Sequence, residues 1–115
     1  MYRFSYAEVL EESPKEARYR ERKAIEHSIE QLTAAEAKGA RSREAIEALL
    51  FVRRLWTLFL EDLARPENEL PQALRGDLIS IGIWILKEAE EIRLERSKNF
   101  KGIVEVSRAI AEGLQ

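Results

Sequence analysis

The sequence contains no cysteine among its 115 residues. Disulfide bonds, thiolate metal sites and cysteine nucleophiles are therefore excluded, and the composition fits a reducing compartment. The most apolar stretch, LISIGIWIL at residues 78–86, has only about half of the roughly 20 residues that span a bilayer. The N-terminal residues MYRFSYAEVL also lack the basic start and unbroken apolar stretch of a signal peptide. We therefore expect a soluble, cytoplasmic protein that does not enter a membrane.

Residues that commonly carry chemistry are scarce. His27 is the only histidine, and no second nitrogen ligand is available to hold a metal with it. The five glycines are scattered and form no phosphate-binding loop. Glu88, Glu91 and Glu95 share one face of a predicted helix, but carboxylates at this spacing among basic residues are usually solvated. We expect no enzyme activity, no metal or other cofactor and no small-molecule substrate.

Charge of one sign is not in excess. Lys and Arg number 19, Asp and Glu number 21, and the net charge is −2. Such a balance gives no long-range field to attract nucleic acid or an anionic membrane. Arg96, Lys98 and Lys101 nevertheless form a local basic cluster beside Phe100. The cluster could hold RNA phosphates with an aromatic ring for stacking, or it could simply be the positive charge that a helix end favours.

The sequence predicts an all-α protein, a compact bundle of about four helices that forms a single domain over residues 1–115. Ser13, Ser42 and Pro71 stand at positions where helices commonly begin, and Gly39 stands where one commonly ends. The predicted elements are a short N-terminal aromatic arm or helix at about residues 1–12 and helices at about 14–38, 43–64, 71–98 and 102–113.

Residues 78–86 are rich in β-branched side chains and, taken alone, could form a strand. The flanking segments QALRGDL and KEAEEIRLER are strong helix formers, and a single helical stripe runs through the ambiguous part. We therefore predict a helix here, with the stripe packed inward. The stripe consists of Leu74, Leu78, Ile81, Ile85, Ala89 and Ile92.

Residues 49–56 read LLFVRRLW, with two arginines inside an apolar run. At about 100° per residue, Arg54 falls on the polar strip of its helix and is expected to be solvated. Arg53 instead falls at the edge of the apolar arc, next to Trp56 one turn on. Its guanidinium could pair with a carboxylate of this chain, stack on an aromatic face or contact another protein.

The predicted third helix has a second apolar set beside its main stripe. Ile79, Ile83 and Leu86 lie roughly 120° around the helix, and Trp84 lies on the far side of the stripe. Such a helix is either central in the bundle or leaves an apolar groove for an amphipathic partner helix.

The sequence resembles the FlaF family of flagellar biosynthesis regulators of alphaproteobacteria. The similarity runs through YRFSYAEVLEESPKEAR, EALLFVRRLWTLFLEDLARPENELP and LISIGIWILKEAE, and so covers nearly the whole chain. The resemblance brings no catalytic motif.

The resemblance implies a post-transcriptional positive regulator of flagellin synthesis that acts as a cytoplasmic flagellin-binding chaperone in flagellum assembly. It also implies that an FlbT-type regulator opposes or complements it, and that the flagellin termini it meets form amphipathic helices in the filament. The alternative is an RNA-binding activator of flagellin translation that uses Arg96, Lys98 and Lys101. The residues expected to contact flagellin are Arg53, Trp56, Ile79, Ile83, Trp84 and Leu86, with Tyr2, Phe4 and Tyr6 of the arm.

Overall fold

The computed structural model describes residues 14–114, and all regular structure in that part of the chain is helical. The aromatic arm predicted for residues 1–12, with Tyr2, Phe4 and Tyr6, lies outside the described residues. The prediction of an all-α bundle of about four helices is confirmed, and the ambiguous apolar stretch is helical. The helices are α2 (Pro14–Lys38), α3 (Arg43–Ala64), α4 (Gln72–Arg93) and α5 (Phe100–Gly113).

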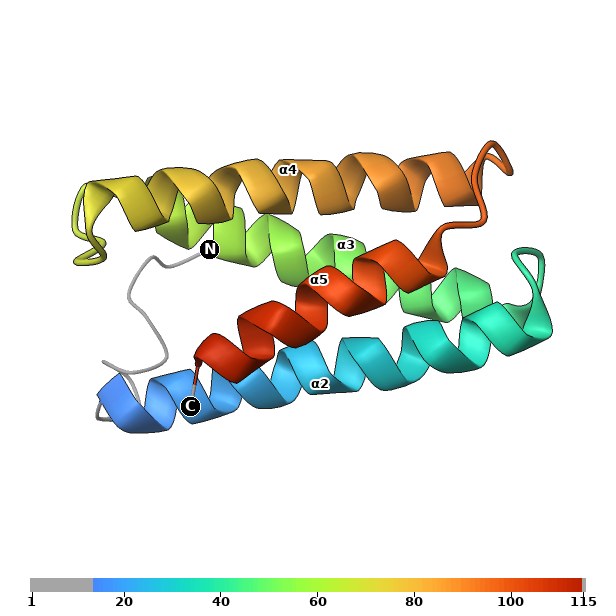
Figure 1. Cartoon of the computed structure of the whole chain (residues 1–115), viewed down its shortest axis with the longest axis horizontal. Coiled ribbons are helices and arrows are strands. Elements are labelled where there is room, and N and C mark those ends of the chain that lie inside the picture. Colours follow the sequence, from blue (N-terminus) through green and yellow to red (C-terminus); the bar gives the residue numbers. More distant parts are fainter. Residues whose placement is uncertain (1–13, 115) are drawn as a thin grey trace.

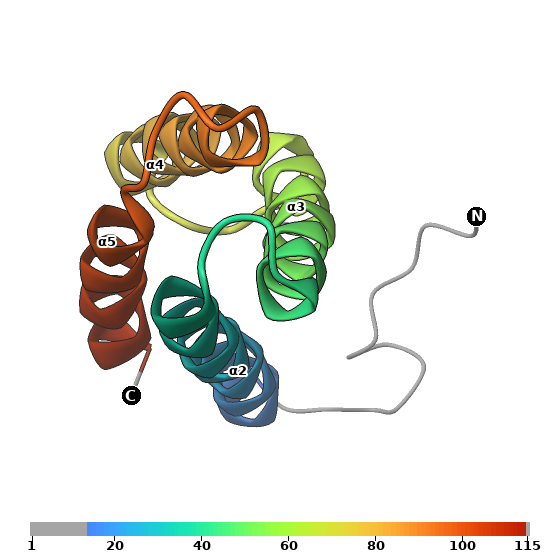
Figure 2. The same cartoon turned by 90° about the vertical axis from the view of Figure 1, so that its right-hand side faces the viewer.

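Successive helices run in opposite directions (Figure 1). Figure 2 shows their order around a ring, in which α3 lies between α2 and α4, and α5 lies between α4 and α2. α2 packs along both α3 and α5, whereas α4 and α5 have far fewer contacts with each other. From the end of α4, α5 slopes away toward the first half of α2 (Figure 1).

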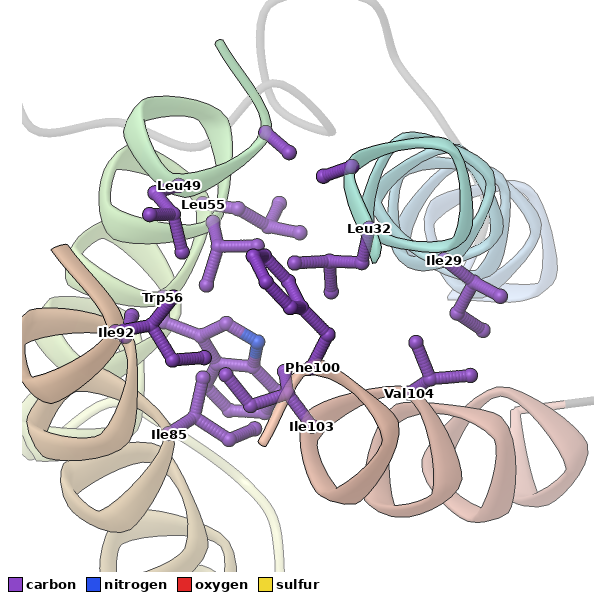
Figure 3. Close-up of a cluster of buried hydrophobic side chains, with 14 of the residues drawn as sticks. Ile29, Leu32, Leu49, Leu55, Trp56, Ile85, Ile92, Phe100, Ile103 and Val104 are labelled. Carbon is purple, nitrogen blue, oxygen red and sulfur yellow. The ribbon is translucent and has the colours of Figure 1, made fainter. Parts of the chain in front are cut away.

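The core lies at the centre of this ring and draws on every helix. Figure 3 shows Leu32 of α2, Trp56 of α3, Ile85 of α4 and Ile103 of α5 gathered in one cluster. Each of these side chains is 2% exposed or less. Because burying a large apolar side chain stabilises a fold by about 1.5–3 kcal/mol, this shared cluster holds the four helices together.

A short turn joins α2 to α3, and its residues terminate one helix and start the next. Gly39 has a φ of 98°, and its N–H donates to the carbonyl of Ala35 at 2.8 Å. This left-handed conformation favours glycine and closes the last turn of α2. The Ser42 hydroxyl then accepts a hydrogen bond from the N–H of Ala45 at 3.1 Å, which caps α3.

α4 ends at Arg93, before the end predicted near Lys98. The backbone turns at Glu95, which has a φ of 61°, and the N–H of Arg96 donates to the carbonyl of Glu91 at 2.8 Å. This bond belongs to a Schellman termination, in which glycine usually occupies the left-handed position. The sequence prediction was wrong because neither glycine nor proline marks this stop.

α5 begins at Phe100, slightly before the start predicted near residue 102. Asn99 explains the difference, because its side-chain oxygen accepts from the N–H of Gly102 at 3.0 Å. The amide group of Asn99 also donates to Glu88 on α4 at 2.8 Å. One side chain therefore caps α5 and ties it to the preceding helix.

The inward stripe predicted for α4 is correct only for the second half of the helix. Ile85, Ala89 and Ile92 are buried, but Leu74 is 44% exposed, and no residue of α4 before Gly82 is buried. The difference arises because α5 slopes away from α4 toward α2 and so covers the first half of α4 less than the second half.

Gly82 lies where α4 packs against α3. A Cβ atom added there would stand 2.9 Å from both Leu60 Cδ2 and Trp56 Cε3. Contacts this short are closer than carbon atoms at their preferred separation of about 3.5–4.0 Å. The bare backbone of Gly82 therefore provides the space that the Trp56 ring occupies in the core.

We expect Gly82→Ala to destabilise the protein by roughly 1–2 kcal/mol net, because the buried Trp56 has little room to move and overpacking outweighs the gain in helix propensity. Gly76 is the matched control, since it lies in the same helix with open space around it. Gly76→Ala should stabilise the fold by about 0.5–1 kcal/mol. Urea unfolding measures both changes, and a Gly82→Ala protein as stable as the parent would contradict the tight contact.

Candidate protein-binding groove

An apolar groove runs along the outer side of the contact between α3 and α4, two helices that lie side by side. We call it the α3–α4 groove. Its volume is about 230 Å³, below the roughly 300–1,000 Å³ of a typical small-molecule pocket. A groove of this size fits individual side chains of another protein. It is lined by Ala40, Ile46, Leu49, Leu50, Arg53, Leu86, Ala89, Glu90 and Arg93.

Each helix contributes four lining residues with the same spacing. On α3 they are Ile46, Leu49, Leu50 and Arg53, at positions i, i+3, i+4 and i+7. This spacing places all four on one face of a helix. On α4 the corresponding positions are occupied by Leu86, Ala89, Glu90 and Arg93.

The apolar part of the groove has a buried floor and exposed walls. Leu49 and Ala89 are 6% and 5% exposed and belong to the core, whereas Ile46 and Leu50 are 62% and 43% exposed. Single exposed apolar side chains are common on protein surfaces, whereas a contiguous apolar set in a hollow is a candidate for an interaction site.

Charged groups line the groove beside the apolar residues. Arg93 donates two hydrogen bonds to Glu90, at 2.8 and 2.6 Å. The pKa of the Glu90 carboxyl is lowered mainly by these hydrogen bonds, which partial desolvation opposes, and further by the charges of Arg93 and Arg53. Glu90 therefore stays ionised and is already engaged by Arg93.

Arg53 has no such partner in the described part of the chain. Its side chain is exposed, and within residues 14–114 its guanidinium forms neither an ion pair nor a hydrogen bond. Its charge acts on Glu90 without direct contact. The internal ion pair considered from the sequence is therefore absent from this part of the chain, which leaves the Arg53 guanidinium without a carboxylate partner among residues 14–114.

The structure brings some of the predicted binding residues together. Arg53 and Leu86 both line the α3–α4 groove. Ile79 and Ile83 precede Leu86 by seven and three positions, so they extend the same side of α4. Ile83 is 44% exposed, which rules out the alternative that it is buried in the core.

The two tryptophans lie elsewhere. Trp56 is 2% exposed and belongs to the core, so the expectation that it contacts a partner is wrong; the space at Gly82 lets it pack inward. Trp84 is 39% exposed and lines a separate hollow with Ile81 and Val106 of α5. Neither ring lines the α3–α4 groove.

Ile46 and Leu50 were not predicted as binding residues from the sequence. The signal that could have found them is the i, i+3, i+4, i+7 spacing that ends at Arg53. Leu50 directly follows the buried Leu49 in the sequence. Dividing a helix into one apolar and one polar face places both leucines on the apolar face and does not show that Leu50 stays exposed.

The basic cluster predicted as an alternative RNA-binding site has no accessible aromatic ring beside it in the described part of the chain. Phe100 is 3% exposed and packs in the core, so it is not available to stack on a base. Arg96 donates to Glu91 at 2.7 Å, and this hydrogen bond lowers the pKa of Glu91 and raises that of Arg96. Lys98 and Lys101 are exposed and remain the cations available to a phosphate.

No helix within residues 14–114 combines the length and the apolar character needed to cross a bilayer.

Comparison with known proteins identifies the family to which this chain belongs. No curated protein and no solved structure matches the chain. A family model described as "Flagellar protein FlaF" matches residues 2–114. Since this match covers nearly the whole chain, the protein belongs to the FlaF family of flagellar proteins.

Proposed function

We propose that this protein is a post-transcriptional positive regulator of flagellin synthesis that binds flagellin in the cytoplasm as a chaperone, using the α3–α4 groove. The observation that carries the proposal is the exposed apolar wall formed by Ile46 and Leu50 beside Arg53. Membership of the FlaF family supports the link to flagella. An FlbT-type regulator is a further expected partner.

An amphipathic helix is the ligand that suits this groove best. Such a helix presents apolar anchors at i, i+3 or i+4, and i+7, which is also the spacing of the lining residues on α3 and α4. The termini of flagellin, expected from the family resemblance to form amphipathic helices, are segments of this kind. A carboxylate on the partner helix would pair with Arg53 and fix its orientation.

The proposal is tested by pull-down of unassembled flagellin and of its leader RNA, each at low and high salt. Binding to phosphates weakens steeply as salt rises, whereas apolar groove binding holds or strengthens. We expect flagellin to be retained at both salt concentrations. A variant carrying Lys98→Glu and Lys101→Glu should retain flagellin equally well. Capture of RNA alone, lost in that variant, would instead assign the protein to RNA-dependent activation.

Leu50→Glu should weaken flagellin binding by at least about 2 kcal/mol, roughly thirtyfold in Kd, because the carboxylate would lose its water against the partner helix. Leu58→Glu is the matched control, since Leu58 lies on the same helix and is 52% exposed but does not line the groove. Titration calorimetry measures both affinities, and thermal melts of both variants should stay close to that of the parent. Equal affinities would show that flagellin does not use the groove.

Arg53→Ala should weaken flagellin binding by roughly 1–2 kcal/mol through loss of a charged pair, with little change in melting temperature. Arg54→Ala is the adjacent control, an exposed arginine that is not part of the groove lining, and it should change neither quantity. A markedly lower melting temperature for Arg53→Ala would instead mean that this charge stabilises the fold.

A further inference from the structure

One end of the bundle presents a second apolar surface that residues 14–114 leave partly uncovered. It lies along the first half of α4, where Leu74 is 44% exposed and Leu78 and Ile81 are half-buried. These residues continue the stripe that is fully buried at Ile85. The apolar stripe of α4 is therefore longer than the part of it that the other helices bury within residues 14–114.

A hollow of about 100 Å³ lies at this end, and all four helices contribute to its lining. Its apolar lining includes Phe59 and Leu63 of α3, Leu78 of α4 and Ile110 of α5. Leu70, in the loop between α3 and α4, also lines it and is 39% exposed. A hollow of this size accepts one or two apolar side chains, and apolar side chains near it remain in contact with water.

We propose that the N-terminal segment of this same chain, residues 1–13, docks on this open end and places its aromatic side chains over the hollow. In an extended segment Tyr2, Phe4 and Tyr6 would share one side, because side chains alternate along an extended backbone. Three aromatic side chains in six residues supply the apolar cover that the end of the bundle lacks.

Connectivity favours this occupant over a separate molecule. The segment joins α2 at Pro14, and Glu21, roughly 10 Å further along the helix at 1.5 Å per residue, lines the hollow. Thirteen residues can extend over roughly 40 Å, so the aromatic residues are within reach. A short tether also keeps the segment at an effective concentration on the order of millimolar. The inference does not depend on the proposed function, because it concerns a different surface.

The absence of cysteine from the sequence makes disulfide mapping direct. One full-length variant carries Glu8→Cys with Leu74→Cys, which leaves all three aromatic residues in place and puts the new thiol on their side of an extended segment. Its matched control carries Glu8→Cys with Leu58→Cys, because Leu58 is also an exposed leucine, at 52%, but lies on α3 and belongs neither to the α4 stripe nor to the lining of the hollow. Both proteins are oxidised at low concentration and followed by mass spectrometry without reductant, after circular dichroism has verified helical folding.

We expect the pair of cysteines at positions 8 and 74 to close within one chain on the order of tenfold faster than the control pair, because docking brings the two Cα atoms toward the 4.4–6.8 Å that a disulfide requires. Adding Tyr2→Ser, Phe4→Ser and Tyr6→Ser should reduce this rate to that of the control. Equal rates for the two pairs would overturn the proposal, as would a rate that does not respond to loss of the aromatic residues. Disulfides formed mainly between chains would assign the open end to a second copy of the protein instead.

Discussion

The contact between Trp56 and the backbone at Gly82 sets the relation between α3 and α4, on which both apolar surfaces depend. Because Gly82 has no side chain, the indole of Trp56 occupies the space between the helices and reaches the core. Because α3 and α4 pack against each other at this contact, their outer faces form the two walls of the α3–α4 groove. The same pairing keeps the first half of α4 folded against α3, although α5 covers that half only in part.

Local chemistry explains how much of the fold could be predicted. Ser42 and Gly39 are strong signals for a helix start and a helix end, and both act as predicted. The end of α4 escaped prediction because Glu95 adopts a conformation that the sequence gives no reason to expect. Periodicity identified the inward stripe of α4, but burial of Leu74 depends on whether another element reaches it, and no local pattern contains that information.

The candidate site was predictable only in part, for a similar reason. Periodicity placed Arg53 at the boundary between apolar and polar faces, and it found the second apolar set of α4 that includes Leu86. Both residues line the groove. Which of the many apolar residues would remain outside the core depended on the pairing of α3 with α4. Trp56 became core because it meets Gly82, whereas Leu50 remained exposed beside the buried Leu49.

The groove also differs physically from the open end. Its walls stand on two helices that are fixed to each other by buried contacts, so filling it requires little ordering of the backbone. In the proposed complex Ile46 and Leu50 would supply apolar area, while Arg53, which has no ion pair within residues 14–114, would supply direction. The open end has no unpaired arginine of this kind, because no basic residue lines it within the described part of the chain. Of the two carboxylates that line it, Asp62 already lies 4.0 Å from the guanidinium of Arg65. A surface of that kind suits a tethered segment, whose attachment to α2 already provides the orientation that a free partner would need to gain from charge.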